Sequence, residues 1–560
     1  MPRWLLLLLC ALYVVPGLLG RDPWRAQDAA GFGVAWTMAR SLGQPGGLAD
    51  WLMPNVLGVP ITEEGPLPFW LGAAAMRALP LLPPDTLMRV TAMGWLTLML
   101  TCLWYGTWLL ARRPEVQPAD PFGASAQRTD FGRAIADSAL LVTLATFGLL
   151  ARAHETTAES AQLAWVTLWL YGCALALLRP RVGGALVGLA IGLTLTTRGL
   201  PTAVALSAAC VALLLLVRPY RLVVGPMLSG LLPAAAASAL PWPLALWLTG
   251  DAGGAHLAQW LGWNRYEVSG PSLDALGYLL RTIPWFYWPA WPLAAWAVWR
   301  WRERRLEPAI AVPGFATIAL VLVAVLAPRD SESALVALVP PLAMLAAFGL
   351  PTIRRSVTSL IDWFAVMTFT LTGLALWAYW IALHTGWPPR MAYRAQQAVV
   401  GFVPELNPVE LLLGAVVTAS WLVLVVLRAS RQPSAMWRSV VLSSGGMVLA
   451  WCLLMTLWLP AGNYRKTYRD VAQQAGAVVT EDHRCVRTFD LDVAQRASFA
   501  YFGGLRLDDV AAGCDWLLVT ERDGVAHQPS RSDVEWRLAW RGQRPADRNE
   551  RFALFRRAGG

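Results

Sequence analysis

The sequence predicts a polytopic α-helical membrane protein that ends in a small soluble α/β domain. Of its 560 residues, 56% are hydrophobic and 15% are charged, whereas soluble chains carry roughly 25% charged residues. The charges are also uneven, because 30 of the 82 lie in the last 100 residues. These observations exclude an ordinary cytosolic protein. They divide the chain into a membrane domain, 1–460, and a soluble domain, 461–560.

Apolar runs of the length that crosses a bilayer, about 20 residues, recur through the membrane domain. We predict about thirteen membrane-spanning helices. They lie near 4–20, 87–111, 134–152, 159–178, 182–197, 200–217, 221–248, 279–300, 307–327, 333–352, 357–384, 407–427 and 439–460. The first run also fits a cleaved signal peptide. We prefer an uncleaved anchor, because cleavage would leave an even number of spans while the loop charges stay the same.

Arginines gather in alternate loops, and the positive-inside rule places those loops in the cytoplasm. The arginine-rich loops hold Arg112 and Arg113, Arg179 and Arg181, Arg218 and Arg221, Arg300 to Arg305, Arg354 and Arg355, and Arg428 to Arg438. The N-terminus is then cytoplasmic. The periplasmic set comprises the C-terminal domain and the connections 21–86, 153–158, the turn at 198, 249–278, 328–332 and 385–406. The net charge of +10 does not indicate nucleic-acid binding, since the basic residues lie between apolar runs.

The first outer loop, 21–86, is long and acidic, and long loops in compact proteins are commonly functional. The stretch from Asp28 to Arg40 has a helical pattern without the hydrophobicity of a span, so we expect a helix in the plane of the membrane interface. The apolar run 66–80 is short and interrupted by prolines. It is predicted to lie at the membrane surface or to re-enter the membrane.

The C-terminal domain combines a helical pattern with strand-like segments. YRKTYRDVAQQAGAVV predicts a helix, and CVRTFDL, ASFAYF, CDWLLVT, WRLAWR and RFALFRR predict strands. Two of the seven cysteines, Cys485 and Cys514, belong to this domain. An outer compartment is oxidising, so we predict a disulfide between them; the alternative is two buried free thiols.

Soluble-enzyme motifs are absent from the sequence: it contains no P-loop, no G-x-S-x-G and no H-E-x-x-H. Its five histidines are scattered, so neither a histidine metal site nor another cofactor is indicated. The groups left for chemistry are acids and arginines at the outer face of the membrane.

The segment DWLMPNVLGVPITEEGPLPFWL, residues 50–71, resembles a stretch of the GT-C class of membrane glycosyltransferases. The similar branch holds aminoarabinose lipid A transferase and the protein O-mannosyltransferases. In that register the family's acidic pair falls on Gln27 and Asp28. HLAQWLGWNRYEVSGPS, WFYWPAWPLAAW and the turn Thr197–Gly199 are also similar to family segments. About thirteen spans with an outer soluble domain is the architecture that the resemblance implies.

Four departures from the family pattern stand out. Gln27 replaces the first acid, Glu64 replaces a lysine associated with the lipid phosphate, Gly65 replaces a proline, and Ser333-Ala334 replaces an Arg-Tyr pair. The phosphate contact must therefore come from elsewhere, or the substrate differs. An inactive relative is also compatible with Gln27.

The resemblance implies an inverting glycosyltransferase of the bacterial inner membrane. It would move a sugar from an undecaprenyl-phosphate carrier to lipid A or another lipid or glycan acceptor at the periplasmic face, as a monomer. A carboxylate on an interfacial helix can accept the proton of the acceptor hydroxyl, and Asp28 is our candidate base; a solvated or helix-capping carboxylate is the alternative.

Candidate substrate-binding residues surround this base. Arg198 and Arg265 are the outward-facing guanidinium groups suited to phosphate, although Arg198 could only anchor its helix. Glu63 and Glu64 either bind acceptor or begin a helix. The remaining candidates are Gln27, His154 and Glu155, for which a structural cluster at the membrane edge is the alternative.

Two other functions are compatible with many spans. A protein or polymer O-glycosyltransferase belongs to the same class. A transporter or lipid-linked flippase belongs to another, but transporters place ionisable residues near the midplane and show repeated halves. The acids of this sequence gather outside, and no internal repeat is visible.

Overall fold

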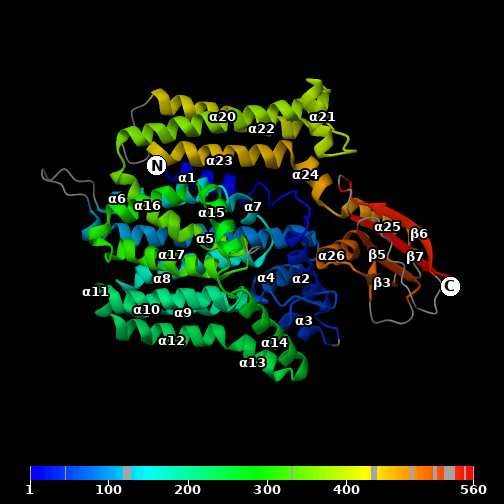
Figure 1. Cartoon of the computed structure of the whole chain (residues 1–560), viewed down its shortest axis with the longest axis horizontal. Coiled ribbons are helices and arrows are strands. Elements are labelled where there is room, and N and C mark those ends of the chain that lie inside the picture. The colour runs from blue at the N-terminus through cyan, green and yellow to red at the C-terminus, as the bar shows by residue number, and fades with distance from the viewer. Residues whose placement is uncertain are drawn as a thin grey trace.

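The first part of the chain forms a bundle of long helices, and the last part forms a small domain at one end of that bundle (Figure 1). The computed structural model describes residues 2–44, 46–117, 128–328, 332–430, 438–479, 485–508, 514–522, 536–545, 547 and 550–558. The bundle helices are α1 (Arg3–Val14), α5 (Pro84–Ala111), α6 (Arg128–Ala145), α8 (Ala158–Ala176), α9 (Pro180–Thr197), α10 (Leu200–Leu216), α12 (Val224–Ala239), α13 (Pro241–Leu248), α15 (Leu273–Phe286), α16 (Ala290–Arg300), α17 (Pro308–Leu326), α19 (Val339–Gly349), α20 (Arg355–Thr385), α22 (Pro408–Ser430) and α23 (Arg438–Leu457). Shorter connecting elements are η1 (Pro114–Val116), α7 (Leu149–Arg152), α11 (Arg218–Arg221), η2 (Arg302–Arg304), α18 (Glu332–Val336), η3 (Leu350–Thr352), α21 (Pro389–Ala398) and α24 (Leu459–Lys466).

Eight helices of the described chain are long and apolar enough to cross a membrane, so the protein is a multi-pass membrane protein. They are Pro84–Ala111, Pro180–Thr197, Val224–Leu248, Pro308–Leu326, Ala334–Thr352, Ser356–Thr385, Pro408–Leu427 and Val440–Leu457. Two further apolar helices, α1 and α10, are shorter. Each of the thirteen predicted runs falls on one or more helices.

Two predicted spans are interrupted. The run 4–20 is helical only to Val14, because Pro16 and Gly17 follow and Gly17 has a φ of +83°. The run 279–300 divides into α15 and α16 on either side of Pro289. Carbonyl groups at this break accept hydrogen bonds from Phe147 and Gly148, so the interruption leaves these backbone groups paired.

The long first loop folds against the end of the bundle. It comprises α2 (Gln27–Ser41), α3 (Gly47–Leu52), β1 (Asn55–Val56), β2 (Val59–Pro60) and α4 (Leu67–Ala78). Helix α14 (Asp251–Tyr266) and the C-terminal domain lie at this same end, whereas α11 lies at the opposite end (Figure 1). The segments predicted to be periplasmic and the arginine-rich turn 218–221 therefore separate to opposite ends of the bundle.

Helix α2 is not the surface helix that its sequence predicts. It packs between α4 and α26 (Val493–Phe502), and most of its residues from Asp28 to Ala39 are buried. Helix α2 is buried against other parts of the protein. Its small residues, such as Gly31 and Gly33, let Thr156 and Ala497 pack directly against the helix backbone. The first loop and the C-terminal domain thus form one packed unit.

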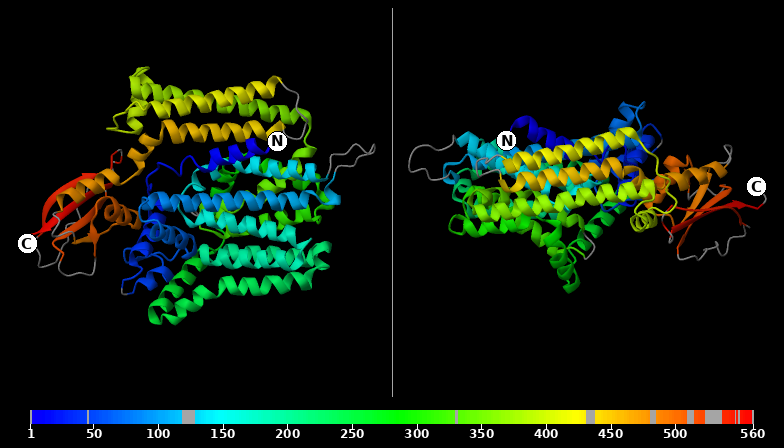
Figure 2. Two further views of the ribbon diagram at one scale, coloured as in Figure 1. Left: turned by 180° about the vertical axis from the view of Figure 1, so that it is seen from behind. Right: turned by 90° about the horizontal axis from the view of Figure 1, so that it is seen from above.

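The C-terminal domain is a five-stranded mixed sheet with the order β4-β3-β5-β7-β6. Its strands are β3 (Cys485–Phe489), β4 (Arg506–Leu507), β5 (Trp516–Arg522), β6 (Trp536–Gln543) and β7 (Glu550–Arg557), with helices α25 (Arg469–Val478) and α26. Strand β3 is parallel to β4 and β5, and β7 is antiparallel to β5 and β6. The domain projects beyond the bundle in the two views of Figure 2.

Two predictions for this domain are wrong. ASFAYF is part of helix α26, because Asp492 and Gln495 form a capping box that starts a helix just before it. The single helix predicted from Tyr464 onward is two helices, α24 and α25, separated at Thr467–Tyr468. The other four predicted strand segments correspond to β3, β5, β6 and β7.

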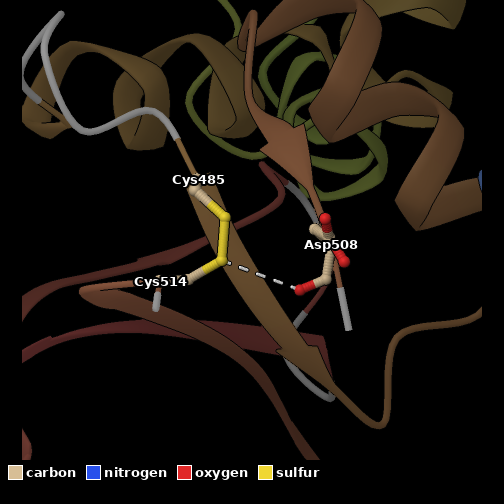
Figure 3. The surroundings of a disulfide bond; sticks show 3 residues. All are labelled: Cys485, Asp508 and Cys514. Atoms are coloured by element: carbon tan, nitrogen blue, oxygen red, sulfur yellow. Dashed lines mark hydrogen bonds between the residues drawn. A yellow bond between two sulfur atoms is a disulfide. The ribbon is translucent and has the colours of Figure 1, made fainter. Parts of the chain in front are cut away.

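Cys485 and Cys514 are bonded in the structure, with 5.1 Å between their Cα atoms (Figure 3). Cys485 begins β3, and the Asp508 carbonyl oxygen lies 3.9 Å from the Cys514 sulfur. The bridge joins residues 29 positions apart, beside the edge of the sheet where β4 pairs with β3.

We expect the variant Cys485→Ser to lower the free energy of unfolding of the C-terminal domain by about 3 kcal/mol, because it releases a loop of intermediate length in the unfolded chain. Thermal unfolding of the full chain with and without reductant measures this effect. Cys173→Ser, which changes a cysteine that is free in the structure, is the control for reductant sensitivity. Equal thiol labelling of Cys485 with and without reductant would contradict the bridge.

Candidate functional site

Glu64 of the first loop and Arg198 at the end of α9 form an ion pair at the domain-bearing end of the bundle. Their side chains lie 3.1 Å apart and are 16% and 15% exposed. Glu64 also accepts a hydrogen bond from the backbone N–H of Ala158, in the first turn of α8. The neighbouring Gly65 donates its N–H to the Thr197 carbonyl at 2.9 Å. A Cβ on Gly65 would lie 1.9 Å from a backbone oxygen, which explains glycine at this position.

The turn after Arg198 is held by α14. The amide oxygen of Asn264 accepts a hydrogen bond from the N–H of Leu200 at 2.6 Å. Gly199 has a φ of +113°, and a Cβ at this position would collide with the Asn264 side chain. The Arg198 guanidinium lies 5.9 Å from the centre of the Trp263 ring. Arg265 follows on the same helix and is exposed. The structure therefore brings the segment that carries Arg265 to Arg198, although its side chain makes no ion pair within the described residues.

Gln27 belongs to a second polar group around Arg152. The Arg152 guanidinium donates to the Gln27 amide oxygen at 2.5 Å and to Glu155 at 3.2 Å, and lies 3.9 Å from Glu159. Glu159 is 1% exposed, and its Oε2 has no hydrogen-bond partner in the described part of the chain. Gln27 aligns with an acidic residue in the family that the sequence resembles. In this chain its amide oxygen accepts a hydrogen bond from Arg152.

Asp28 is enclosed. Its carboxylate is 1% exposed and lies 2.8 Å from Arg21 and 3.3 Å from Arg89, both of which are 2% exposed. It accepts the backbone N–H of Trp24 at 3.0 Å, and both the N–H and the hydroxyl of Thr156 at 2.8 Å. Asp28 therefore links the N-terminus of α2 to α5 and to the turn between α7 and α8.

These contacts argue against Asp28 as a base. Burial alone raises the pKa of a carboxyl group, but the charges of Arg21 and Arg89 and the hydrogen bonds outweigh it and hold the pKa of Asp28 well below its usual value. A carboxylate that holds its proton so weakly, and that accepts so many donors, is a poor proton acceptor. Its contacts instead position Thr156, next to Glu155.

Two other carboxyl groups have the opposite shift. Burial raises the pKa of Glu64 to about 7, although Arg198 opposes the increase. Burial also raises the pKa of Glu155 to about 7; Arg152 opposes it, and the nearby charges of Asp28 and Glu159 reinforce it. Both groups can gain or lose a proton near neutral pH, which suits acid–base work.

The remaining predicted site residues lie apart from this chemistry. Glu63 is exposed. His154 is fully buried beneath the site, with its ring nitrogens 2.6 Å from the carbonyls of Leu150 and Tyr13. Burial lowers the pKa of His154 to about 4, so it is neutral and donates to one carbonyl only. The structure thus gives His154 a packing role, in correction of its predicted contact with substrate.

Sequence reasoning missed Arg21, Arg89, Arg152 and Thr156. Arg89 offered a signal, because a charged residue in an apolar run marks a buried partner; its partner, Asp28, could not be named from the sequence. Among the described residues, no group of three or more His, Cys, Asp or Glu side chains could hold a metal ion.

This chain has the fold of a solved membrane glycosyltransferase of the GT-C class. Two solved structures of ArnT, the aminoarabinose lipid A transferase of this class, from Cupriavidus metallidurans match it over nearly its whole length. The form bound to undecaprenyl phosphate is 15% identical with a TM-score of 0.69, covering 98% of each chain. The apo form is 14% identical with a TM-score of 0.67, covering 98% of this chain and 97% of that one.

A more distant match is the oligosaccharyltransferase AglB from Archaeoglobus fulgidus, at 12% identity and a TM-score of 0.46, covering 90% of this chain and 64% of that one. No protein-family model and no curated protein matches the sequence. The resemblance indicated by residues 50–71 is confirmed at the level of the fold.

Proposed function

We propose that the protein is an inverting glycosyltransferase that transfers a sugar from a polyprenyl-phosphate carrier to lipid A or another envelope acceptor at the periplasmic face of the inner membrane. The observation that carries the proposal is the convergence of Glu64, Arg198, Arg152 and Glu155 at one end of an ArnT-like bundle. A lipid-linked donor keeps its tail in the bilayer and its phosphate at the interface. Its reacting atoms therefore need charged groups at the end of the bundle.

Arg198 is the proposed phosphate ligand. A guanidinium offers forked donors to phosphate oxygens and stabilises the charge that develops as the phosphate leaves. In the structure the Arg198 guanidinium is already paired with the Glu64 carboxylate, at 3.1 Å. Since the pKa of Glu64 is about 7, protonation of Glu64 at neutral pH weakens this pair and releases Arg198 to the donor. Arg265, exposed on the adjoining helix, is a second proposed contact.

Glu155 is the proposed general base. Its pKa near 7 matches the range in which a carboxylate both exists in the charged form and accepts a proton effectively. Its side chain is 23% exposed, so a substrate can reach it. Removing the proton of the acceptor hydroxyl allows that oxygen to attack the anomeric carbon while the C–O bond to phosphate breaks, which inverts the centre in one step. Asp28 acts as a positioning residue through Thr156.

The direct test uses the purified full-length protein in lipid nanodiscs with a radiolabelled undecaprenyl-phosphate sugar and either lipid A or extracted envelope glycolipids. We expect labelled acceptor together with free undecaprenyl phosphate. Transfer to a peptide or protein fraction alone would favour the O-glycosyltransferase alternative. Absence of transfer with a panel of polyprenyl-phosphate sugars and all these acceptors would reject the proposal.

Replacing Glu64 by glutamine is expected to lower the KM for the donor by about three- to tenfold, because a partly exposed ion pair worth about 1 kcal/mol no longer competes for Arg198. Above pH 7 the wild-type donor KM should increase as Glu64 ionises, whereas that of Glu64→Gln should stay level. Steady-state kinetics between pH 6 and 8.5 measures both effects. An increased KM for the acceptor in this variant would instead assign Glu64 to acceptor binding.

A further inference from the structure

A cavity of about 900 Å³ lies between the first loop and the C-terminal domain, away from the carboxyl cluster. Its walls come from the second half of α2, from the segment 50–58, and from residues 500–507 at the end of α26 and in β4. The polar side chains that line it include Arg40, Ser41, Gln44, Asp50, Asn55 and Arg506.

The walls of this cavity are fixed by hydrogen bonds between the two domains. The buried Arg496 donates to the Leu57 carbonyl at 3.1 Å. The hydroxyl of Tyr501 donates to Asp85 at 2.9 Å, at the start of α5. Because these contacts hold Leu57 and Tyr501, two residues of the lining, the shape of the cavity exists before any ligand binds, which lowers the entropic cost of binding.

The charge of the cavity is positive. Arg40 and Arg506 are exposed, and neither makes an ion pair within the part of the chain that the structure describes. Arg40 is held over the Trp36 ring at 4.6 Å. Among the described residues of the lining, the one carboxylate is Asp50, which accepts a hydrogen bond from the amide of Asn55 at 2.8 Å. Two unpaired guanidinium groups and one engaged carboxylate favour an anionic ligand.

The other lining groups suit a carbohydrate. The amide of Gln44 supplies both a donor and an acceptor, as the hydroxyl groups of a sugar require. The Ser41 hydroxyl and the Asn55 amide already donate within the protein, and their oxygens offer lone pairs to the ligand. The volume accommodates several sugar rings. Arg40 lies thirteen residues beyond Gln27 on α2, which corresponds to about 20 Å along a helix. A ligand in this cavity is therefore separated from Glu155 by the length of a short oligosaccharide.

We propose that this cavity binds an acidic saccharide of the acceptor, with Arg40 and Arg506 as ligands of its carboxylate or phosphate groups. The inference rests on the proposed glycosyltransferase function for the identity of the ligand as acceptor. It implies that the acceptor is an extended anionic glycan, bound by the first loop and the C-terminal domain while a more distant hydroxyl group reacts.

The test measures binding without any donor, by fluorescence anisotropy of three labelled probes with the full-length protein in nanodiscs. The probes are trigalacturonic acid, phosphorylated maltotriose and neutral maltotriose, which separate carboxylate, phosphate and uncharged sugars. We expect at least one acidic probe to bind at least tenfold more tightly than maltotriose. The double variant Arg40→Ala/Arg506→Ala should lose at least tenfold of that affinity.

The matched control is Arg537→Ala, which removes an exposed arginine from β6 of the same domain and should leave binding unchanged. Equal binding of acidic and neutral probes, or an unchanged affinity in the double variant, overturns the inference. The binding assay contains no donor, so it is independent of the transfer assay. If the probes do not bind but sugar transfer is intact, the saccharide site is rejected and the proposed function stands. If the acidic probes bind but no transfer occurs, the proposed function is rejected and the cavity remains a saccharide-binding site.

Discussion

Replacing Asp28 by alanine is expected to lower the free energy of unfolding by about 3–5 kcal/mol, since it leaves buried guanidinium groups without their counter-charge. Arg21 and Arg89 are each 2% exposed and share the Asp28 carboxylate. The same change also releases the N–H and the hydroxyl of Thr156. We therefore expect the turn between α7 and α8, which carries Glu155, to lose its position together with the stability.

Thermal or denaturant unfolding of the full chain in detergent measures this loss. Asp274→Ala, which removes an exposed aspartate in the first turn of α15, is the control and should cost less than about 1 kcal/mol. Residual transfer by Asp28→Ala should still depend on the ionisation of Glu155, with a lowered pKa because the charge of Asp28 no longer raises it. Disappearance of that dependence in a stably folded variant would instead identify Asp28 as the base.

The pH dependence of stability follows from the depressed pKa of Asp28. A carboxyl group whose pKa is lower in the folded state binds fewer protons there than in the unfolded chain. Its contribution is fully present above the unfolded pKa, about 3.9, and is lost as the pH falls toward the folded value. The wild-type protein should therefore lose stability relative to Asp28→Ala when the solution is acidified below about pH 4.

Replacing Glu155 by glutamine is expected to lower kcat by about 10²- to 10⁴-fold, the usual contribution of a general base. The proton acceptor is lost, while the amide can still accept a hydrogen bond from Arg152. For the wild type, kcat at saturating donor should fall about tenfold per pH unit below the Glu155 pKa of about 7 and level off above it. This sign follows because only the ionised carboxylate accepts the proton.

Pre-steady-state transfer of a labelled sugar across pH 5.5–8.5 measures both the loss and the profile. Glu405→Gln is the matched control, since Glu405 is exposed in the segment that leads to α22, away from the carboxyl cluster. Two results would contradict a role for Glu155 in the chemical step. One is a Glu155→Gln variant with the wild-type kcat. The other is a variant with a reduced kcat that still falls at acidic pH as the wild-type kcat does.

Much of the architecture could be predicted from the sequence because the bilayer imposes a simple length and hydrophobicity rule. Each predicted apolar run corresponds to helical structure. The failures occurred where local signals competed: Pro16 and Gly17 end α1 early, and the Asp492 capping box makes a helix of a segment rich in strand-forming residues. Hydrophobicity alone does not report such local hydrogen bonding.

The candidate site was predictable in part. The motif in residues 50–71 identified the loop, and the positive-inside rule grouped Glu64, Glu155 and Arg198 with it. Asp28 was predicted to be the catalytic base, but its surroundings, which argue against that role, could not be anticipated. The two arginines that lower its pKa lie 7 positions before it and 61 positions after it, and no sequence pattern specifies such a pairing.

The sequence by itself determined a multi-pass helical protein with a GT-C-like first loop and a soluble C-terminal domain, because transfer of apolar side chains and charges between water and lipid acts on each segment independently. Only the tertiary structure decided which carboxyl groups hold protons near neutral pH. Burial, ion pairs and hydrogen bonds depend on side chains from distant segments, and these gave Asp28 a lowered pKa and Glu64 and Glu155 raised ones.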